Sequence, residues 1–471
     1  MTVTAPERDL PTLLRSQQQA FLAEMMPTRA VREDRLNRLG RLIETHGDRF
    51  AASISRDFGT RSPTEIRITE TMVLQSGIRH ARRHLAAWMK PRRVATALAY
   101  RPGRSMVMRQ PLGVIGIISP WNYPLQLALG PLIGALAAGN RAMIKPSELT
   151  PSFSAALQAA FAESFAADEV AVVTGDAAVG KAFAALPFDH LVFTGSTAVG
   201  REVAQAAAKN LTPVTLELGG KSPAIIDASC NLAEVADRLA WGKLINAGQT
   251  CIAPDYALVP RGDVDRFVQA LRAGMLRLYP TFRANPDYAG IINERHWQRL
   301  HDLVDDARAR GARVIELEPS SEGVGRQLAP TLLLDVNDEM RVMREEIFGP
   351  VLPIVAYDTL ADALAYVNRH DRPLALYWFG TDRAARDRVL AGTIAGGVTI
   401  NDTLMHIAQD GLPFGGVGAS GHGRYHGEFG FRQFSQEKAV FVQSRFAGSG
   451  IIRPPYKPSI GRLLGWLSRI T

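Results

Sequence analysis

The pattern of hydrophobic and polar positions divides the chain into a helical opening and a longer region of alternating strands and helices. Between residues 15 and 95, apolar residues recur at helical spacing among Arg, Ala and Glu. From residue 112, short β-branched runs end in turn residues and lead into alanine-rich helical segments. These runs are GVIGIIS, RAMIK, EVAVVTG, HLVFTGS, VTLELGG and PAIID. Strands that alternate with helices predict a mostly parallel sheet, with ligands at the carboxyl ends of its strands.

A second series of strands predicts a second α/β domain. Its runs are YALVP (256–260), ARVIEL (312–317), PVLPIVAY (350–357), LALYWFG (374–380) and GGVTIN (396–401). The segment AYRPGRSMVMRQPLG (99–113) alternates apolar and polar residues around a Pro-Gly pair, which predicts a β-hairpin. The fold class predicted is therefore α/β.

Composition adds limits on the class of function. The chain has 471 residues, of which 46% are hydrophobic and 21% charged, as is typical of a globular protein with more than one domain. The formal net charge is +8, but the basic residues form no cluster, so nucleic acid is not an expected partner. Only two cysteines occur and no signal segment opens the chain, which predicts a reduced, cytoplasmic protein.

Two apolar stretches raise the question of membrane contact. PLQLALGPLIGALAAG (124–139) contains a proline and is shorter than the roughly 18 residues that a membrane span needs, so it predicts a buried helix. A second apolar stripe near the end of the chain is formed by Ile460, Leu463, Leu464 and Leu467. We expect this C-terminal stripe to pack against the protein or a partner subunit, and contact with a membrane surface is left open.

Cys251 is the candidate nucleophile. The segment LAEVADRLAWGKLINA (232–247) predicts a helix that ends at Gly248, which places Cys251 in the turn beyond it. A structural cysteine would belong on the periodic apolar face, whereas a reactive thiol needs partial exposure and neighbours that favour the thiolate. Cys230 has no such setting. Neither cysteine has a metal-type spacing around it, so no metal site is predicted.

Two further residues could assist a nucleophile. Asn122 lies between two prolines in IISPWNYP, a rigid turn that could hold an amide donor for an oxyanion. The alternative is an asparagine that satisfies its own turn. Glu217 lies in the apolar strand VTLELGG, where burial would raise its pKa toward that of a base working near neutrality. On the local sequence alone, a solvent-facing glutamate is slightly favoured.

Two segments could bind a nucleotide. LVFTGSTAVGREVAQAAA (191–208) predicts a strand, a turn and a helix whose N-terminus, with Gly195 and Ser196, suits a pyrophosphate. An ordinary tight turn is an equal alternative, because the three-glycine fingerprint is absent. Lys145 and Glu148 follow the strand in RAMIKPSE and could hold ribose hydroxyls, although a surface ion pair is the commoner meaning of such a spacing.

Taken together, these motifs resemble the successive signatures of the aldehyde dehydrogenase superfamily. They are SPWNYP, IKPSE, FTGSTAVG, LELGGKSP, NAGQTCIAPD, EEIFGPVLP and LPFGGVGASGHGRYHG. The resemblance covers nearly the whole chain in the expected order. The compact N-terminus, GQTCIAPDY and the final YHG motif look like the class 3 branch. The QQQAFL opening and the GFRQFSQEKAV tail look most like its bacterial coniferyl-aldehyde dehydrogenase members.

The resemblance implies oxidation of an aldehyde with NAD(P). Cys251 would attack the aldehyde carbon to form a thiohemiacetal, and Asn122 with the Cys251 backbone N–H would stabilise the oxyanion. Hydride transfer to the nicotinamide would leave a thioester, which a water activated by Glu217 would hydrolyse. The residues implied to bind the cofactor are Trp121, Lys145, Glu148, Gly195, Ser196, Gly200, Leu218, Glu346 and Phe348.

The resemblance also implies roles within this set and a division of the chain. Lys145 and Glu148 would hold the adenosine ribose, and Glu346 and Phe348 the nicotinamide ribose and ring. A Rossmann-like domain, a catalytic domain, a small β oligomerisation element and a tail are implied. Their residues, in that order, are 1–98 with 114–213, 214–430, 99–113 with 431–448, and 449–471. Class 3 relatives are usually dimers, so a homodimer is expected.

Several alternatives stay open at this point. A cofactor-independent cysteine hydrolase or thioesterase would use the same thiol but needs a histidine base, and the motifs carrying Cys251 and Glu217 contain none. A catalytically silent relative would have lost a chemical residue, and a CoA-acylating enzyme would not need Glu217.

Cofactor and substrate are less clearly indicated than the reaction. Glu148 favours NAD over NADP, because a carboxylate repels a 2′-phosphate, although use of NADP is not excluded. Trp121, Tyr123 and Phe414 favour an aromatic or long apolar aldehyde, and coniferyl aldehyde is the hypothesis from resemblance.

Overall fold

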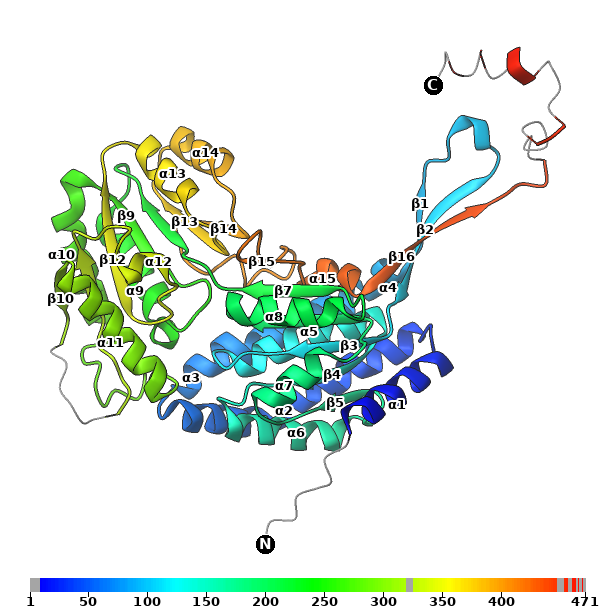
Figure 1. Ribbon diagram of the computed structural model, residues 1–471, viewed down its shortest axis with the longest axis horizontal. Helices are drawn as coiled ribbons and strands as arrows, with labels where there is room; N and C mark the ends of the chain where they lie inside the picture. The colour runs from blue at the N-terminus through cyan, green and yellow to red at the C-terminus, as the bar shows by residue number, and fades with distance from the viewer. Residues whose placement is uncertain are drawn as a thin grey trace, which may run out of the picture.

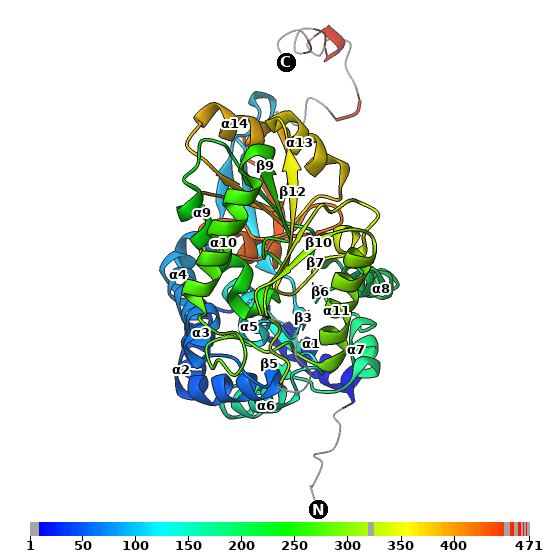
Figure 2. The ribbon, with the colours of Figure 1, turned by 90° about the vertical axis from the view of Figure 1, so that its left-hand side faces the viewer.

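Three β-sheets organise the part of the protein that the structure describes (Figure 1). The computed structural model describes residues 9–318, 325–446, 453–455, 460–462, 465 and 468. Within them, a six-stranded and a seven-stranded sheet form two domains (Figures 1 and 2), and a three-stranded sheet forms an arm that projects away from both in Figure 1. The α/β fold class is confirmed.

The six-stranded sheet belongs to the first domain and has the strand order β15-β7-β6-β3-β4-β5. All its pairs are parallel except β15 with β7. Parallel strands are buried on both faces, which is why they appear in the sequence as continuous apolar runs. The strands are β3 (Val114–Ile118), β4 (Arg141–Lys145), β5 (Val170–Val172), β6 (His190–Gly195), β7 (Val214–Leu218) and β15 (Gly421–His422).

Helices cover both faces of this sheet. One face packs against α2, α4, α5 and α6, and the other against α1, α7 and α8. The apolar stretch 124–139 forms α5, a helix buried along almost its whole length, as predicted. The helices are α1 (Leu10–Ala23), α2 (Arg29–Phe58), α3 (Pro63–Ile66), the π-helical turn η1 (Arg67–Thr71), α4 (Met72–Met89), α5 (Pro124–Ala138), α6 (Pro151–Ser164), α7 (Ala177–Ala184) and α8 (Thr197–Ala208).

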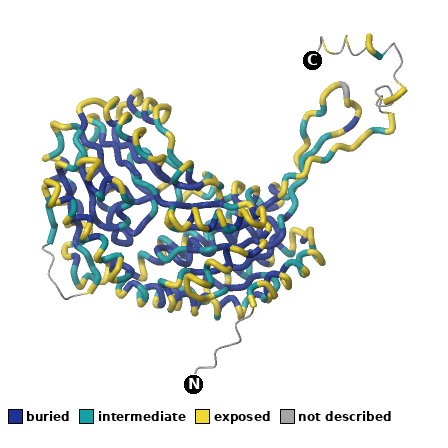
Figure 3. The backbone as a smooth tube through the Cα atoms, in the orientation of Figure 1, coloured by how far each residue is buried: buried dark blue, intermediate teal, exposed yellow. Residues whose placement is uncertain are grey.

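The seven-stranded sheet has the order β10-β11-β12-β9-β8-β13-β14, with β10 as its one antiparallel edge strand. Its strands are β8 (Pro223–Ile226), β9 (Tyr256–Pro260), β10 (Arg313–Glu316), β11 (Thr331–Leu334), β12 (Val351–Tyr357), β13 (Ala375–Phe379) and β14 (Gly397–Ile400). Its main helices are α9 (Leu232–Leu244), α10 (Val264–Leu278), α11 (Glu294–Ala309), α12 (Arg341–Arg344), α13 (Leu360–Arg369) and α14 (Arg383–Gly392). The central strands of both sheets are the most buried part of the chain (Figure 3).

The arm consists of β1 (Arg92–Val94), β2 (Arg104–Pro111) and β16 (Ser435–Val442). The hairpin predicted over residues 99–113 therefore begins earlier, because β1 pairs with residues 105–107 and the Pro-Gly pair lies in the connection ahead of β2. β16 follows the short helix α15 (Gly427–Gln433) and pairs with β2 along its whole length.

The sheets also divide the chain at a different place from the boundary predicted between residues 213 and 214. β7 hydrogen-bonds to β6 and so belongs to the first sheet, whereas β8 is the first strand of the second. The chain passes from the first sheet to the second in the turn 219–222. The predicted boundary at 430 falls inside α15.

The predicted C-terminal stripe lies largely outside the described residues, because Leu463, Leu464 and Leu467 are not among them. Among the helices that the structure describes, none is long and apolar enough to cross a membrane.

Candidate active site

The turn that carries Cys251 is held in an unusual backbone conformation. The predicted helix over 232–247 ends at Leu244, three residues early, because Asn246 and Ala247 both have a φ of 51°. Alanine alone favours a helix there, but tertiary hydrogen bonds of Asn246 override that propensity. Its Nδ2 donates to the backbone oxygens of Asn122, at 2.9 Å, and Gln249, at 3.2 Å.

Gln249 ties this turn to the rest of the second domain. Its side chain donates to the backbone oxygens of Asn246 and Gly290, both at 3.0 Å, and accepts from the backbone N–H of Ile292. The hydroxyl of Tyr377 donates to the carbonyl of Ile252. Hydrogen bonds on both sides of Cys251 therefore fix the loop that presents the thiol.

The Cys251 residue is partly exposed, but its sulfur is surrounded by protein atoms. Burial of the sulfur, with the carboxyls of Glu346 and Glu217 nearby, raises the thiol pKa to about 12. The neighbours in the free protein therefore disfavour the thiolate, so a base or a positive charge brought by a ligand has to activate it. Cys230 also has a raised pKa, to about 11, because of burial and Asp227.

Glu217 is buried at only 2% exposure, which excludes the solvent-facing alternative. Burial raises its pKa well above the usual range, and Arg424 opposes this only in part. Among the described residues, none donates a hydrogen bond to either of its carboxyl oxygens. A buried carboxyl with free acceptors, close enough to the Cys251 thiol to affect its pKa, has the properties of a general base.

The structure brings Asn122 against the Cys251 turn. Its Nδ2 donates to the backbone oxygen of Gln249 at 3.1 Å, and the residue is 2% exposed. It does not satisfy its own turn, which was the alternative. An amide nitrogen has two N–H donors, so one remains for an oxyanion on a substrate held by Cys251.

Lys145 and Glu148 form an ion pair at 3.1 Å directly after β4. Lys145 is buried at 3% side-chain exposure, whereas Glu148 is 45% exposed. This differs from an ordinary surface pair, in which both side chains are exposed. The carboxyl ends of β3, β4, β6 and β7 meet at this same edge of the parallel sheet.

The α8 motif lies at the same edge. Ser196 caps α8 by accepting a hydrogen bond from the N–H of Val199 at 3.4 Å. The two glycines have packing roles: a Cβ on Gly195 would lie 2.6 Å from the Phe193 ring, and one on Gly200 would lie 2.6 Å from Leu218. These close contacts hold the positive N-terminal end of α8 at the strand ends, where an anion would be stabilised.

Glu346 and Phe348 face this edge from the second domain. The Glu346 residue is partly exposed, but its carboxyl rests against the backbone of Gly219, and desolvation of this carboxyl with Asp255 nearby raises its pKa to about 8. Its Oε1 accepts no hydrogen bond from any described residue. Phe348, whose φ is 53°, packs edge-on against Trp121 with the ring centroids 5.3 Å apart.

Two networks of charged residues surround the site, and only the first has its residues within the motifs quoted from the sequence. Lys221 pairs with Asp255 and donates to the backbone oxygens of Val342 and Glu345, while Asp255 accepts from the N–H of Ile347. This network fixes the segment that carries Glu346. Arg61, Glu65 and Glu70 form a second buried network behind Asn122. The second network lies outside those motifs.

The fold and the site together define a two-domain α/β enzyme, in which a thiol and a buried carboxyl meet groups suited to a dinucleotide where the two sheets adjoin. The model of the aldehyde dehydrogenase family matches residues 5–440. The chain belongs to this family, and it is an oxidoreductase that converts an aldehyde to the carboxylic acid. Members of the family use NAD(P).

Similar proteins narrow the comparison to one branch. Coniferyl aldehyde dehydrogenase of a Pseudomonas species (strain HR199) is 48% identical over 444 residues, which cover 92% of each chain. Aldehyde dehydrogenase family 3 member B1 of Homo sapiens is 40% identical over 432 residues, 92% of this chain and 91% of its own. The substrate-bound structure of Staphylococcus aureus AldH superposes with a TM-score of 0.93 at 39% identity, covering 98% of this chain and all of that one. The predicted resemblance to the class 3 branch is confirmed.

Proposed function

We propose that the protein oxidises an aromatic or long apolar aldehyde, with coniferyl aldehyde as the first candidate, and that it prefers NAD. The observation that carries this proposal is the meeting of Cys251, Glu217 and Glu346 at the edge of the first sheet. The name of the Pseudomonas relative supports the choice of substrate.

The residues would act in sequence on the aldehyde. Once the thiol has lost its proton, the Cys251 thiolate bonds to the carbonyl carbon, the C=O π electrons move to the oxygen, and the free N–H of Asn122 with the Cys251 backbone N–H donates to the developing oxyanion. NAD supplies the acceptor for the hydride that leaves this carbon. The resulting thioester is then hydrolysed by a water from which Glu217 takes the proton.

The residues present fit a dinucleotide. The Lys145–Glu148 pair lies at the end of β4, the N-terminus of α8 lies at the end of β6, and a buried oxygen of Glu346 has no hydrogen-bond donor among the described residues. A lysine and a carboxylate suit ribose hydroxyls, and the helix end suits the pyrophosphate. Glu148 supports NAD as the preferred cofactor because a 2′-phosphate would lie beside its charge.

The tail of the aldehyde is proposed to enter a cavity whose volume, about 40 Å³, is smaller than an aromatic ring, so its lining has to move apart when the aldehyde binds. The cavity lies between α4, α5 and the 410–427 segment, and its lining includes Trp88, Gln126, Gly130, Tyr425 and His426. Tyr425 lies close to the reacting groups. Burial and the charges of Glu217 and Cys251 together raise the pKa of its hydroxyl. This lining differs from the aromatic trio predicted from sequence: Tyr123 is stacked on Arg61 and bonded to Thr250 instead.

The arm supports a homodimer. Its surface exposes several apolar side chains that a soluble monomer would normally cover. They include Leu98 at 77%, Tyr100 at 58%, Phe441 at 48% and Phe446 at 89% exposure. Cytoplasmic location stays a prediction from the cysteine content.

Mixing the purified protein with NAD and a panel of hexanal, benzaldehyde and coniferyl aldehyde tests the proposal through NADH absorbance. Cys251→Ala is the inactive comparison, and Cys230→Ala is the matched control at the other thiol. We expect NADH formation that is lost only in Cys251→Ala, with the highest kcat/KM for coniferyl aldehyde. A much higher kcat/KM for short aliphatic aldehydes would overturn the substrate assignment.

The cysteine hydrolase is the competing function. It needs a histidine as base, and in the described part of the chain no histidine hydrogen-bonds to Cys251. Ester hydrolysis without any NAD or NADP reduction in the same assay would favour it.

A further inference from the structure

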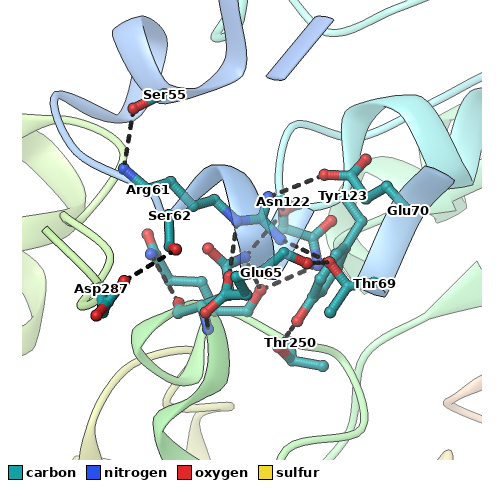
Figure 4. Close-up of polar contacts among 12 residues, drawn as sticks. Ser55, Arg61, Ser62, Glu65, Thr69, Glu70, Asn122, Tyr123, Thr250 and Asp287 are labelled. Atoms are coloured by element: carbon teal, nitrogen blue, oxygen red, sulfur yellow. Dashed lines mark hydrogen bonds and ion pairs between the residues drawn. The ribbon is translucent and has the colours of Figure 1, made fainter. Parts of the chain in front are cut away.

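A largely buried charge cluster lies directly behind the turn that carries Asn122 (Figure 4). Arg61 and Glu70 both have 0% exposed side chains and pair at 3.1 Å, while Glu65 binds the Arg61 Nε at 2.9 Å. The Arg61 guanidinium also lies over the ring of Tyr123, 4.7 Å from its centroid. Buried charges are costly, and an apolar core of the same volume is often as stable, so stability alone is a weak reason for this cluster.

The contacts of the cluster lead to the two segments that carry the proposed chemistry. Arg61 Nη1 donates to the backbone oxygen of Asn122 at 2.9 Å. Glu70 Oε2 accepts from the backbone N–H groups of Leu125, at 2.8 Å, and Gln126, at 3.1 Å. It thereby caps the N-terminus of α5, the helix that begins two residues after Asn122.

Glu65 extends the same cluster to the turn that carries Cys251. Its Oε2 accepts from the backbone N–H of Asn246 at 3.1 Å. The Asn246 side chain in turn donates to the backbone oxygen of Asn122. Tyr123, under the guanidinium, shares a hydrogen bond of 2.7 Å with Thr250, the residue before Cys251. Arg61 and its two carboxylates therefore join the Asn122 turn to the Cys251 turn across the domain junction.

A local distortion of the helix makes this arrangement available. Glu65 and Glu70 are five residues apart, and on a regular α-helix such positions lie about 140° apart around the axis. The π-helical turn Arg67–Thr71 begins two residues after Glu65 and contains Glu70, and its hydrogen bonds between residues i and i+5 bring such positions back toward one side. Both carboxylates can then reach the same guanidinium. Single π-helical turns occur frequently at functional sites.

We propose that Arg61 and Glu70 are positioning residues, whose buried ion pair holds Asn122 and the Cys251 turn at the spacing that the oxyanion requires. This inference rests on the roles proposed above for Cys251 and Asn122. Neither residue contacts the aldehyde, and both act through the backbone of the Asn122 turn. A displacement of about 1 Å between reacting groups can cost about a hundredfold in rate, so a small relaxation of this turn has a measurable effect.

The test compares Glu70→Gln and Arg61→Lys with the wild type in the first turnover, with NAD and aldehyde both saturating and in excess over enzyme, so that the amplitude of the initial NADH phase counts the folded active sites. Glu70→Gln keeps an acceptor for the Leu125 and Gln126 N–H groups but removes the charge. Arg61→Lys keeps the charge but cannot reach both carboxylates and the Asn122 oxygen with one ammonium. We expect the rate constant of NADH formation to fall by about tenfold to a hundredfold in each, with an unchanged Kd for NAD.

The readout separates positioning from folding. Misfolded enzyme lowers the amplitude of the first turnover, whereas a displaced Asn122 lowers its rate constant. Glu169→Gln is the matched control, because Glu169 bridges Arg35 and Arg38 beside β5. We expect it to lower Tm and leave the rate constant unchanged. Glu70→Ala, which also loses the cap of α5, should be slower than Glu70→Gln.

Wild-type rate constants in both Arg61→Lys and Glu70→Gln, with only Tm or amplitude reduced, would overturn the inference and leave the cluster a purely structural one. An absence of NADH formation in the wild type itself would instead refute the proposed function. The two failures are therefore distinguishable in one experiment.

Discussion

The carboxyl group of Glu346 rests directly on the backbone of Gly219, so closely that a Cβ atom at position 219 would overlap its Oε2. The two residues come from different domains: Gly219 follows β7 of the first sheet, and Glu346 precedes β12 of the second. A glycine is therefore needed here for close approach, and the contact sets how deeply Glu346 reaches toward the proposed nicotinamide ribose.

Gly219→Ala is expected to displace Glu346 and raise the Kd for NAD by about tenfold or more, the loss typical of a hydrogen bond to a charged group. Fluorescence titration with NAD measures this. Gly262→Ala is the control, because no atom lies within 4 Å of a Cβ there. The double variant Gly219→Ala with Glu346→Ala should regain Tm, since the overlap is gone, yet still bind NAD weakly. An unchanged Kd in Gly219→Ala would contradict the proposed role of Glu346.

The role of Glu217 is tested by separating acylation from hydrolysis. Glu217→Gln should form about one NADH per active site and then stop, because the thioester on Cys251 waits for a water that no base activates. Hydroxylamine, a nucleophile that needs no such base, should restore turnover. Hydrolysis in the wild type should rise with pH, because burial raises the pKa of Glu217 and only its ionised form accepts a proton. Continued turnover of Glu217→Gln without hydroxylamine would exclude this role.

The same burial predicts how stability depends on pH. The pKa of Glu217 in the folded state is raised well above 4.5, so between these values the folded protein binds more protons than the unfolded chain. Its contribution to stability is therefore complete below pH 4.5 and is lost as pH rises toward the raised pKa. Glu217→Gln has no such proton to lose, so its Tm should exceed that of the wild type by a margin that grows with pH. Glu339→Gln, at an exposed carboxyl, is the control in the same thermal scans.

The sequence predicts the residues that follow strands better than those that meet through the tertiary structure. Cys251, Glu217 and Lys145 are recognisable because each lies at the end of a helix or strand that hydrophobic periodicity reveals. Arg61 and Glu70 leave no such trace, because rules based on composition place arginine and glutamate at the surface. Their partner Asn122 is far away in the sequence, and only the fold brings the three together.

The two corrections to local structure have the same origin. Ala247 has a high helix propensity, so the sequence extends α9 to it, but the hydrogen bonds of Asn246 to the Asn122 turn force a left-handed backbone. Likewise the Pro-Gly pair predicts a hairpin centred on itself. In the structure this pair lies in the connection between β1 and β2, and residues 92–94 pair with residues 105–107. In both places, tertiary contacts outweigh the local signal.

The tail cavity gives a prediction on specificity. A Cβ on Gly130 would lie 3.2 Å from the Tyr425 ring, so Gly130→Leu should fill the cavity from α5. We expect kcat/KM to fall about tenfold to a hundredfold for coniferyl aldehyde and to change little for acetaldehyde, because the size of the pocket then excludes the ring. Gly47→Leu, where a Cβ would have no atom within 4 Å, is the control. An equal loss for both aldehydes would show that the cavity does not hold the tail.

The arm makes the proposed homodimer testable. Leu98 is 77% exposed in the connection between β1 and β2, and an apolar side chain at the tip of a projecting arm is best explained by a partner subunit that covers it. Leu98→Asp places a charge in that interface, so sedimentation should show a shift from dimer to monomer. Leu211→Asp is the matched control, since Leu211 is 88% exposed in the turn after α8, on the body of the first domain. A wild type that sediments as a monomer, or a dimer that Leu98→Asp leaves intact, would exclude the tip of the arm as the interface. Kinetics of the monomeric variant then decide whether the active site, which draws all its proposed residues from one chain, works without its partner.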